Sequence, residues 1–296
     1  SSAASDVYKR QVLLGREVRI KQIIADMGLD GANDLEIINA KISDHNKDYI
    51  GFLYKKLRRR GVLQRDCQRM VNHDRNVFAA CMVANGHADA LVTGMTRSFQ
   101  ASFEYVTQVI GPKKGKEFVT TSMLVSRGRT VFMGDTSIHE RPSGDQMADI
   151  AEVIAEKARS MGHIPRVAIL SFSNFGSPES EITQTARDAV AVLDKRKVKF
   201  EYEGEMTGDI ALDYDLMQSR YPFSRLTGPA NILVMPGLHS ANISFKLMQQ
   251  LGGGSVIGPM ILNGEYPFQI IPMSASVSDL VNAAALAAYE SLTPQE

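Results

Sequence analysis

The sequence predicts an α/β protein of two domains, each built on a parallel sheet with crossover helices. The chain has 296 residues, which exceeds the roughly 250 at which a single hydrophobic core usually stops growing. Its composition is 44% apolar and 22% charged, as in ordinary globular proteins. Short β-branched runs alternate with helical periodicity along nearly the whole chain, which is typical of βαβ units.

We expect strands where short apolar runs are bounded by turn residues. In chain order these are Val12 to Leu14, Glu36 to Ile38, Ala90 to Thr93, Thr130 to Gly134, Arg166 to Ser171, Asn231 to Met235, Val256 to Ile261 and Gln269 to Pro272. Irregular stretches near 135–145 and 258–269 are the expected domain crossings. The first domain is therefore predicted at 12–134 plus 265–296, and the second at 135–264.

Capping residues mark the expected helix ends. Ser43 predicts a helix start, and the apolar positions from Gln64 predict one continuous helix that Gly86 ends. Ser177-Pro178-Glu179 predicts another start, with proline at the first helical position. Ser276 to Asp279 has the spacing of a capping box, with Asp in place of the usual Glu.

Charge and hydropathy exclude several classes of function. Lys plus Arg equals Asp plus Glu at 33 each, so no global field favours a nucleic acid or an anionic membrane. The longest apolar stretches, such as Ser255 to Leu262, are much shorter than a membrane helix. Ser1 to Gln11 lacks the pattern of a secretory signal. We therefore expect a soluble cytoplasmic protein.

The two cysteines, Cys67 and Cys81, fall on the single helix predicted from Gln64. At about 1.5 Å per residue they would lie about 21 Å apart along its axis. That separation is too large for a disulfide, so we expect two buried thiols in a reducing compartment.

The short motifs that often reveal chemistry are missing, including the P-loop, G-x-G-x-x-G, H-E-x-x-H and paired C-x-x-C. Gly252 to Gly254 precedes a predicted strand, which favours a helix stop over a phosphate-binding loop. His239 and Ser240 follow a strand, where ligands often bind, but capping a helix from Ala241 is the preferred interpretation. The six histidines have no metal-ligand spacing; they are His45, His73, His87, His139, His163 and His239.

The best generic ligand contact is the loop that includes Thr96, Arg97 and Ser98, because it follows a strand and opens a helix. Such a loop can offer backbone N–H groups and one cation to an anion, although a plain turn with an exposed arginine is the alternative. Two basic runs, Arg58 to Arg60 and Lys113 to Lys116, are interpreted as solvated charge, with contact to a nucleotide phosphate as the minor alternative.

Long ordered blocks of the sequence carry a family resemblance. Residues 231–247 read Asn-Ile-Leu-Val-Met-Pro-Gly-Leu-His-Ser-Ala-Asn-Ile-Ser-Phe-Lys-Leu, 251–259 read Leu-Gly-Gly-Gly-Ser-Val-Ile-Gly-Pro, and 276–286 read Ser-Val-Ser-Asp-Leu-Val-Asn-Ala-Ala-Ala-Leu. These blocks resemble the C-terminal signature of phosphate acetyltransferases. Agreement extends back through residues 88–94, 132–135 and 147–151, so nearly the whole chain is covered.

The resemblance implies two α/β domains with parallel-sheet cores and an active-site cleft between them, as in the isocitrate and isopropylmalate dehydrogenase-like superfold. It also implies that a strand and a helix normally precede the Val12 block and are lacking here. Acetyl transfer between CoA and phosphate needs cations for the phosphate and the tetrahedral oxygen, and a base for the thiol. In the family, arginines supply those cations.

The chain departs from the family at these cationic positions. The family turn Lys-Pro-Val-Asn-Asp-Leu-Ser-Arg aligns with 266–273, so the Ser-Arg pair becomes Pro272 and Met273. A second family arginine aligns with Glu104, which reverses the charge. Asp279 matches the retained acidic position. Loss of each cation costs about 3 to 4 kcal/mol of barrier by analogy with oxyanion-hole donors, which favours a catalytically silent region without catalytic residues.

Units with these departures resemble the C-terminal region of hybrid bacterial NADP-dependent malic enzymes. Residues 65–69, 74–80 and 228–231 resemble that subgroup in particular. The resemblance implies an acetyl-CoA-sensing and oligomerisation region that regulates an N-terminal malate-decarboxylating domain, which itself uses NADP and a divalent metal. The expected acetyl-CoA contacts are Thr96, Arg97, Ser98, Glu104, Tyr266, Met273, Ser274 and Asp279, with no metal site in this chain.

Two alternatives stay open at this stage. One is an active acyltransferase for a related acyl-CoA, in which Arg97 or Arg225 has taken over anion binding. The other is an oligomerisation module that binds no ligand. In either case the resemblance implies a homo-oligomer.

Overall fold

The structure is a computed structural model that describes residues 10–29 and 35–292. It divides into two units, the first comprising the residues up to 115 and from 264 onward, and the second comprising 116–263. The chain thus passes between the units at 115/116 and 263/264, whereas the sequence predicts crossings at 134/135 and 264/265.

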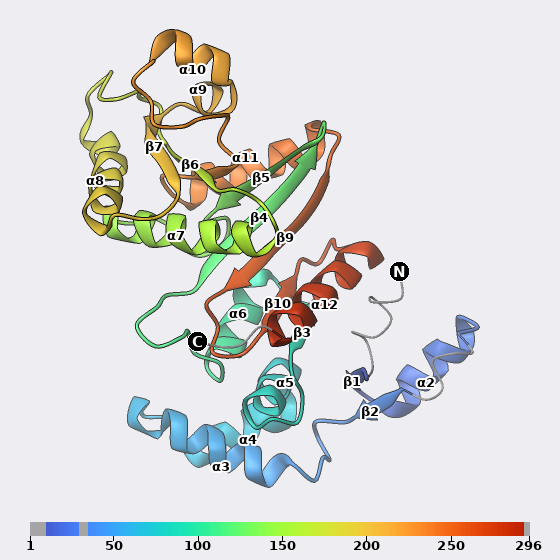
Figure 1. The fold of residues 1–296 in the computed structure, drawn as a ribbon. Helices are drawn as coiled ribbons and strands as arrows, with labels where there is room; N and C mark the ends of the chain where they lie inside the picture. The colour runs from blue at the N-terminus through green and yellow to red at the C-terminus, as the bar shows by residue number, and fades with distance from the viewer. Residues whose placement is uncertain (1–9, 30–34, 293–296) are drawn as a thin grey trace. The chain divides into compact units, whose positions relative to one another are not determined.

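Unit 1 combines helices with two small parallel sheets (Figure 1). One sheet pairs β1 (Val12–Leu14) with β2 (Glu36–Ile38), and the other pairs β3 (Leu91–Gly94) with β10 (Phe268–Ile271). The helical elements are α2 (Glu17–Asp26), α3 (Asn46–Leu57), η2 (Arg58–Arg60), α4 (Gln64–His73), α5 (Arg75–Ala84), α6 (Phe99–Thr107) and α12 (Val277–Leu292). Both α6 and α12 pack on the β3–β10 pair, so the C-terminal helix lies in the first unit.

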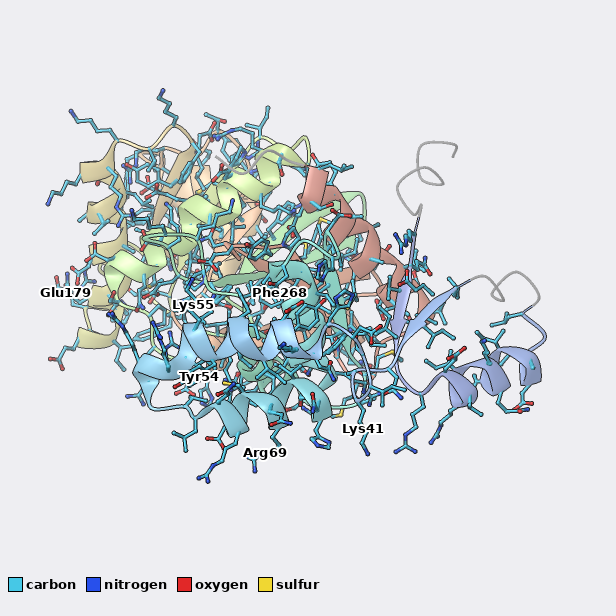
Figure 2. The ribbon with its side chains drawn as sticks, turned by 90° about the horizontal axis from the view of Figure 1, so that it is seen from below. Lys41, Tyr54, Lys55, Arg69, Glu179 and Phe268 are labelled. Carbon is cyan, nitrogen blue, oxygen red and sulfur yellow. The ribbon has the colours of Figure 1, made fainter. Side chains whose placement is uncertain are left out.

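Helix α5 is the centre of the unit 1 core. Its residues 76–83 are all buried, as expected for a helix that is covered on every side. Tyr49 and Leu53 of α3 are fully buried too, and the Tyr49 ring meets the Phe78 ring edge-on at 5.1 Å. Figure 2 shows α3 and α4 side by side, with Arg69 pointing outward from α4. The basic runs 58–60 and 113–116 are exposed, as predicted.

The long helix predicted from Gln64 is in fact two helices. Asp74 ends α4, and its side chain accepts hydrogen bonds from the backbone N–H groups of Asn76 and Val77, so it caps α5. Cys67 and Cys81 therefore lie on different helices, and the separation predicted along one axis is wrong. The prediction of buried free thiols is confirmed, and burial raises the pKa of Cys81 to about 12.

Unit 2 is built on one six-stranded sheet in the order β7-β6-β8-β5-β4-β9. Its strands are β4 (Val119–Ser126), β5 (Arg129–Gly134), β6 (Arg166–Leu170), β7 (Glu201–Met206), β8 (Ile232–Val234) and β9 (Ser255–Leu262). Strands β7, β6, β8 and β5 run parallel, but β4 is antiparallel to both of its neighbours. The four parallel strands form the parallel core that the sequence predicts, and the antiparallel β4 is an addition beside it. The β4–β5 hairpin also explains the earlier domain crossing, because both strands belong to this sheet.

Two layers of helices cover the unit 2 sheet (Figure 1). Helices α7 (Gly144–Ser160) and α8 (Glu181–Arg196) lie side by side on one face. The other face is covered by α9 (Gly208–Leu212), α10 (Tyr214–Arg220) and α11 (Leu238–Leu251). Successive strand residues point to opposite faces of the sheet. Met133 belongs to the hydrophobic cluster under α9 to α11, and the next residue, Gly134, lies against Ile150 and Ile154 of α7.

Strands β4 and β7 were missed because their buried positions are polar. In β4, Thr120, Thr121 and Ser122 are buried. In β7, Glu203 and Glu205 are buried, and they form ion pairs with Arg225 and Arg187 respectively. The alternation that marks a half-buried strand is therefore hidden, because hydrogen-bonded and charged side chains occupy the inner face.

Helix starts show where local capping signals succeed and fail. The capping box at Ser276–Asp279 and the stop at Gly252 are confirmed. Helix α8 begins after Ser180 rather than Ser177, because the Ser180 side chain accepts the hydrogen bond from Ile182. Helix α11 begins at Leu238 after Gly237, so His239 and Ser240 lie in its first turn and do not cap it. Helix α3 begins at Asn46, two residues after the predicted start.

We predict that Gly94→Ala destabilises unit 1 severely. Gly94 has φ +126°, and an added Cβ would lie 2.0 Å from the carbonyl oxygen of Ile271. A backbone atom cannot move aside as the end of a flexible side chain can. We therefore expect the free energy of unfolding, measured in urea, to fall by about 3 kcal/mol or more.

Gly86→Ala is the matched control for this substitution. Gly86 also has positive φ, at +74°, but nothing lies within 4 Å of an added Cβ. It should therefore cost only about 1 kcal/mol, the conformational penalty alone. Equal losses in the two variants would contradict the close approach of β3 to β10.

Candidate functional site

The pairing of β3 with β10 brings two predicted ligand loops together. The strands are parallel neighbours with Ile271 opposite Gly94, so the loops that follow them start at the same edge. The backbone N–H of Met95 donates to the Ile271 carbonyl at 3.4 Å. The structure therefore brings the loop that contains Thr96, Arg97 and Ser98 beside the loop that contains Met273 and Ser274. Carboxyl ends of parallel strands are where α/β folds commonly bind ligands.

Each of these loops leads into the N-terminus of a helix. Ser98 caps α6, with its Oγ accepting from the Ala101 N–H at 3.3 Å. Within the described residues, the backbone N–H groups of Phe99 and Gln100 have no acceptor, and neither do those of Val277 and Ser278 at the start of α12. Unsatisfied N–H groups at a helix start favour an anion, so both loops offer donors to the same kind of ligand.

Arg97, the cation of the loop after β3, is held in place by two contacts. Its Nη1 donates to the carboxylate of Asp74, whose side chain is largely buried. Its guanidinium also lies 4.9 Å from the centre of the Tyr105 ring, which is a cation–π contact. The Asp74 carboxylate neutralises much of the Arg97 charge, which leaves little of it for a bound phosphate.

Glu104, Pro272 and Met273 are the residues that the sequence resemblance aligns with the family's cationic positions. Glu104 lies on the second turn of α6, is exposed, and its carboxylate has no hydrogen-bond or ion-pair partner among the described residues. Pro272 is half-buried, and Met273 is 62% exposed. A free carboxylate and an apolar side chain thus stand at positions where the family pattern carries guanidinium groups.

Asp279 has a local structural partner. Its Oδ2 accepts hydrogen bonds from both the backbone N–H and the Oγ of Ser276, each at 2.8 Å, and its own N–H donates to Ser276 Oγ at 3.2 Å. These reciprocal bonds close the first turn of α12. The retained acid therefore serves as a helix cap through Oδ2, while its Oδ1 has no hydrogen-bond partner among the described residues.

Tyr266 does not join the other candidates. It precedes β10, whereas Met273 and Ser274 follow that strand, so the full length of β10 separates them. Of the predicted site residues, Tyr266 is the one that the strand places at the opposite end of the sheet. The prediction that grouped Tyr266 with the others used position within an aligned turn, which carries no information about strand direction.

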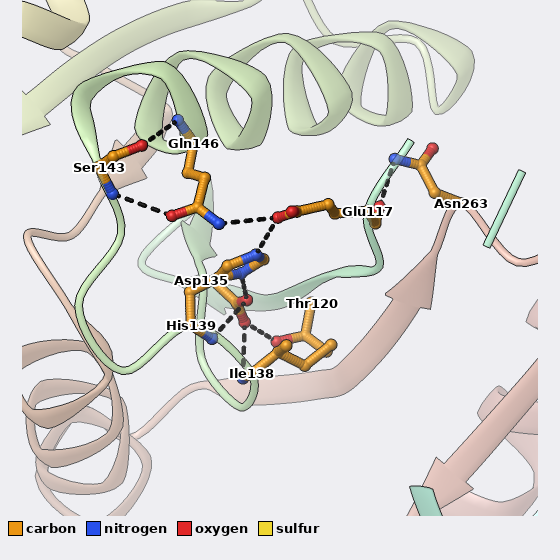
Figure 3. Close-up of polar contacts among 8 residues, drawn as sticks. All are labelled: Glu117, Thr120, Asp135, Ile138, His139, Ser143, Gln146 and Asn263. Atoms are coloured by element: carbon orange, nitrogen blue, oxygen red, sulfur yellow. Dashed lines mark hydrogen bonds and ion pairs between the residues drawn. The ribbon is translucent and has the colours of Figure 1, made fainter. Parts of the chain in front are cut away.

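Unit 2 contains a buried hydrogen-bonded chain that sequence reasoning missed (Figure 3). The Asp135 carboxylate follows β5 directly and is almost fully buried. It accepts from the N–H groups of Ser137 and His139, from the Thr120 hydroxyl, and from His139 Nδ1 at 2.5 Å. The other ring nitrogen, Nε2, lies 3.1 Å from Glu117 Oε2. The sequence signal that could have predicted this network is an acid directly after a strand, Asp135, with a histidine four residues later, His139.

This chain joins the start and end of unit 2. Gln146, in the capping box of α7, donates to Glu117 Oε2 at 2.9 Å. The side-chain amide of Asn263 donates to the Glu117 carbonyl at 3.0 Å. Residues 117 and 263 adjoin the two crossings between the units. The network therefore fixes both connections to the loop after β5.

The electrostatics of the network favour a charged histidine. The hydrogen bond to Asp135 raises the pKa of the His139 imidazole above its ordinary value. Hydrogen bonds from Gln146 and His139 lower the pKa of the Glu117 carboxyl. Because both ring nitrogens already have partners, His139 has no free lone pair for use as a base. His139 is therefore better suited to a structural role, in which it links Asp135 to Glu117, than to a catalytic one.

Other chemistry of the described residues is limited. No three His, Cys, Asp or Glu side chains gather as a metal site within 10–29 and 35–292. None of the helices in those ranges is long and apolar enough to cross a bilayer. Arg225, which the sequence offered as a substitute anion binder, lies in unit 2 and donates to Glu203 and Asp194.

Comparison with known proteins identifies the family. A family model for phosphate acetyl/butaryl transferase matches residues 2–288. The chain belongs to this family, and the resemblance read from the sequence is confirmed. Among solved structures, a phosphotransacetylase from Streptococcus pyogenes matches with a TM-score of 0.87 and 26% identity over 98% of this chain and 90% of that chain. EutD phosphotransacetylase from Staphylococcus aureus matches with a TM-score of 0.84 at the same identity and coverage.

Within the family, the chain is similar to part of larger proteins. It is 47% identical over 283 residues to the NADP-dependent malic enzyme of Rhizobium meliloti, covering 95% of this chain and 37% of that protein. It is 40% identical to a probable NADP-dependent malic enzyme of Rickettsia prowazekii, covering 96% and 38%. The phosphate acetyltransferase of Helicobacter pylori is 27% identical, covering 94% and 54%. The chain thus spans little more than a third of the malic enzymes it matches.

We predict that His139→Gln destabilises unit 2 in a pH-dependent manner. A raised pKa means that the folded state binds the proton more tightly than the unfolded chain does. The stabilisation is therefore complete below the ordinary histidine pKa of about 6.5 and is lost as the pH rises through the raised value. Glutamine can still donate to Asp135 but carries no charge. We expect about 1 to 3 kcal/mol of destabilisation at pH 5.5, shrinking at pH 8.5.

Urea unfolding at a series of pH values measures this difference. His239→Gln is the matched control, because His239 is an exposed histidine in the same unit with no recorded partner among the described residues. Its effect should be near zero at every pH. If His139→Gln lowered the free energy of unfolding by the same amount at every pH, this would contradict a charged His139 that links Asp135 to Glu117.

Proposed function

We propose that this chain is the acetyl-CoA-binding regulatory region of an NADP-dependent malic enzyme, and that it has no transacetylase activity of its own. The similarity to malic enzymes at 47% and 40% identity, against 27% for a phosphate acetyltransferase, supports the choice of parent protein. The oxidative decarboxylation of malate, with NADP and a divalent metal, is assigned to the rest of that larger protein.

The observation that carries the proposal is the charge at the paired strand ends. Phosphate must be held by cations while it attacks the acetyl carbonyl, and the tetrahedral oxygen must be stabilised. Here Arg97 is paired with Asp74, Met273 is neutral, and Glu104 is a free carboxylate. Asp279, the retained acid, caps α12 through Oδ2. These residues do not supply the cations of the family reaction, and an acid without those cations does not stabilise the charge that develops in it.

The same loops still fit the binding of a CoA thioester. Backbone N–H groups at the starts of α6 and α12 are donors for phosphate or carbonyl oxygens, and exposed Met273 offers an adaptable apolar surface to an acyl chain. Binding without turnover is what a sensor needs. A ligand regulates a distant site only through different affinities for two states of the protein, and unproductive binding preserves that ligand.

Self-association is a further part of the proposal. Helix α11 exposes Ile243, Leu247 and Leu251, which recur every four residues and so form one apolar stripe. A stripe of this kind supports contact with a second copy of the chain. Helix α11 follows β8 and covers a sheet face, so the stripe is carried on a rigid element.

We predict that the chain produces no acetyl phosphate from acetyl-CoA and phosphate, because two cations are absent from the reacting centre. At about 3 kcal/mol each, their loss corresponds to a rate reduced by about 10⁴-fold or more. Calorimetry on the same preparation should still report acetyl-CoA binding. The active phosphotransacetylase from Streptococcus pyogenes, assayed in parallel, is the positive control. Sustained formation of acetyl phosphate would contradict the regulatory function. A calorimetric titration without binding heat would exclude acetyl-CoA as the ligand.

The alternative is an active acyltransferase for a different acyl-CoA, and one observation favours it. The Arg97 side chain is 41% exposed, so its guanidinium can turn toward a ligand if the Asp74 contact is given up. Assays with butyryl-CoA and propionyl-CoA separate the two proposals. If turnover appears with either and Arg97→Gln abolishes it, the acyltransferase is correct.

We predict that Glu104→Arg tightens acetyl-CoA binding. Glu104 lies six residues beyond the Ser98 cap, about 9 Å along the helix, where its charge opposes the phosphates of CoA. Reversing an exposed charge at this range changes binding by about three- to tenfold. Calorimetry at low salt measures the change, since salt screens such charges.

The matched control is Asp89→Arg. Asp89 is an exposed carboxylate without a recorded partner among the described residues, and it precedes β3, so it lies toward the other end of the strand. It should leave binding nearly unchanged. Identical isotherms for the parent and Glu104→Arg would remove Glu104 from the site.

A further inference from the structure

Unit 2 has a cavity at the amino ends of β6 and β7, away from the loops described above. Its volume is about 460 Å³, within the range of small-molecule sites. It is formed by the end of α7, the loop into β6 and the turn into β7. Its lining residues are Arg159, His163, Ile164, Pro165, Lys199, Phe200 and Glu201.

Two of the residues that line this cavity, Arg159 and Lys199, are cations in a chain whose net charge is zero. Lys199 lies in the turn from α8 to β7, is exposed, and its ammonium has no partner among the described residues. Arg159 of the opposite wall is also exposed. A cluster of unpaired cations around a concave surface raises the local concentration of anions.

The two acidic side chains nearby have hydrogen-bond donors of their own. Asp194 accepts from the Tyr202 hydroxyl at 2.5 Å and from Arg225 at 2.6 Å. Glu201, the acid in the cavity wall, accepts from the backbone N–H of Thr227 at 2.9 Å and from its hydroxyl at 2.8 Å. Asp194 is therefore paired with Arg225, whereas Glu201 keeps its negative charge, so the lining carries two cations, Arg159 and Lys199, against one anion.

The backbone carbonyls around the cavity already accept hydrogen bonds, so they repel an anion less than free carbonyls would. The carbonyls at the end of α7 would repel one, but those of Lys157, Ala158 and Arg159 accept hydrogen bonds from the N–H groups of residues 161–163. Arg159 Nη2 donates to the Lys199 carbonyl at 3.2 Å and so joins the two walls. The Ile164 carbonyl is held by the Asn231 amide at 2.8 Å.

Apolar groups in the walls narrow the class of ligand. Ile164 is 73% exposed although it sits in the cavity wall, and Phe200 presents an aromatic ring that meets the Tyr202 ring edge-on at 6.0 Å. Inorganic phosphate would use the cations but not these surfaces. A planar base beside an aromatic ring, with phosphates against arginine and lysine, uses both.

We propose that this cavity binds a nucleoside diphosphate, with the phosphates on Arg159 and Lys199 and the base against Phe200 and Ile164. His163 adds a ring donor to the phosphate side. The site is formed by unit 2 alone, so it does not depend on the proposal for the strand ends of unit 1.

Calorimetry with ADP on the whole chain tests the proposal, with adenosine and pyrophosphate as part-ligands. We expect ADP to bind more tightly than either. The double variant Arg159→Gln with Lys199→Gln should weaken ADP binding about tenfold or more, because charge-assisted contacts to phosphate are lost. Ile164→Ser should weaken ADP binding but leave pyrophosphate binding unchanged.

Lys246→Gln is the matched control, because Lys246 is an exposed lysine on α11 outside the cavity. It should bind ADP as the parent does, and circular dichroism with thermal unfolding should show that every variant is folded. No ADP binding at millimolar concentration overturns the proposal. So does pyrophosphate binding as tight as ADP binding, and so does ADP binding that responds to Glu104→Arg but not to the cavity variants. Failure here would leave acetyl-CoA binding by the parent chain unaffected.

Discussion

The parallel pairing of β3 with β10 is the constraint on which unit 1 depends. It joins residues 91–94 to residues 268–271 across the whole of unit 2 in the sequence. The pairing sets Gly94 against Ile271 so closely that no side chain fits between them. It also places two loops and two helix starts at one edge. A ligand site at that edge can form only when the last part of the chain has returned, which couples binding to completion of the fold.

Buried acids organise unit 2 in a comparable way. Asp135, Glu203 and Glu205 are nearly inaccessible, and each accepts several hydrogen bonds or forms an ion pair. A buried carboxylate without donors would be very costly, so these contacts fix the loops that carry the donors. The Asp135 network has the widest reach, because it extends through His139 to Glu117 and so to the start of the unit.

The relation to phosphate acetyltransferases explains why both fold and departures matter. The fold match is close across nearly the whole chain, so the framework of the family is retained. The charge at the strand ends differs, with Arg97 paired and Glu104 free. A change of a few side chains on a retained framework alters what a site does without altering where it is. The proposed sensing role follows from that combination.

The sequence by itself determined the α/β class, eight of the strands, the buried thiols, the capping box at Ser276 and the loop around Arg97, because each has a local signal in periodicity or turn chemistry. It also determined the family and the charge reversal at Glu104. The tertiary structure alone decided that β4 runs antiparallel, that Asp74 divides one expected helix and that Tyr266 lies away from Met273. It alone paired Arg97 with Asp74, and joined Asp135 through His139 to Glu117. These features depend on contacts between residues distant in sequence, and such contacts have no local pattern from which to read them.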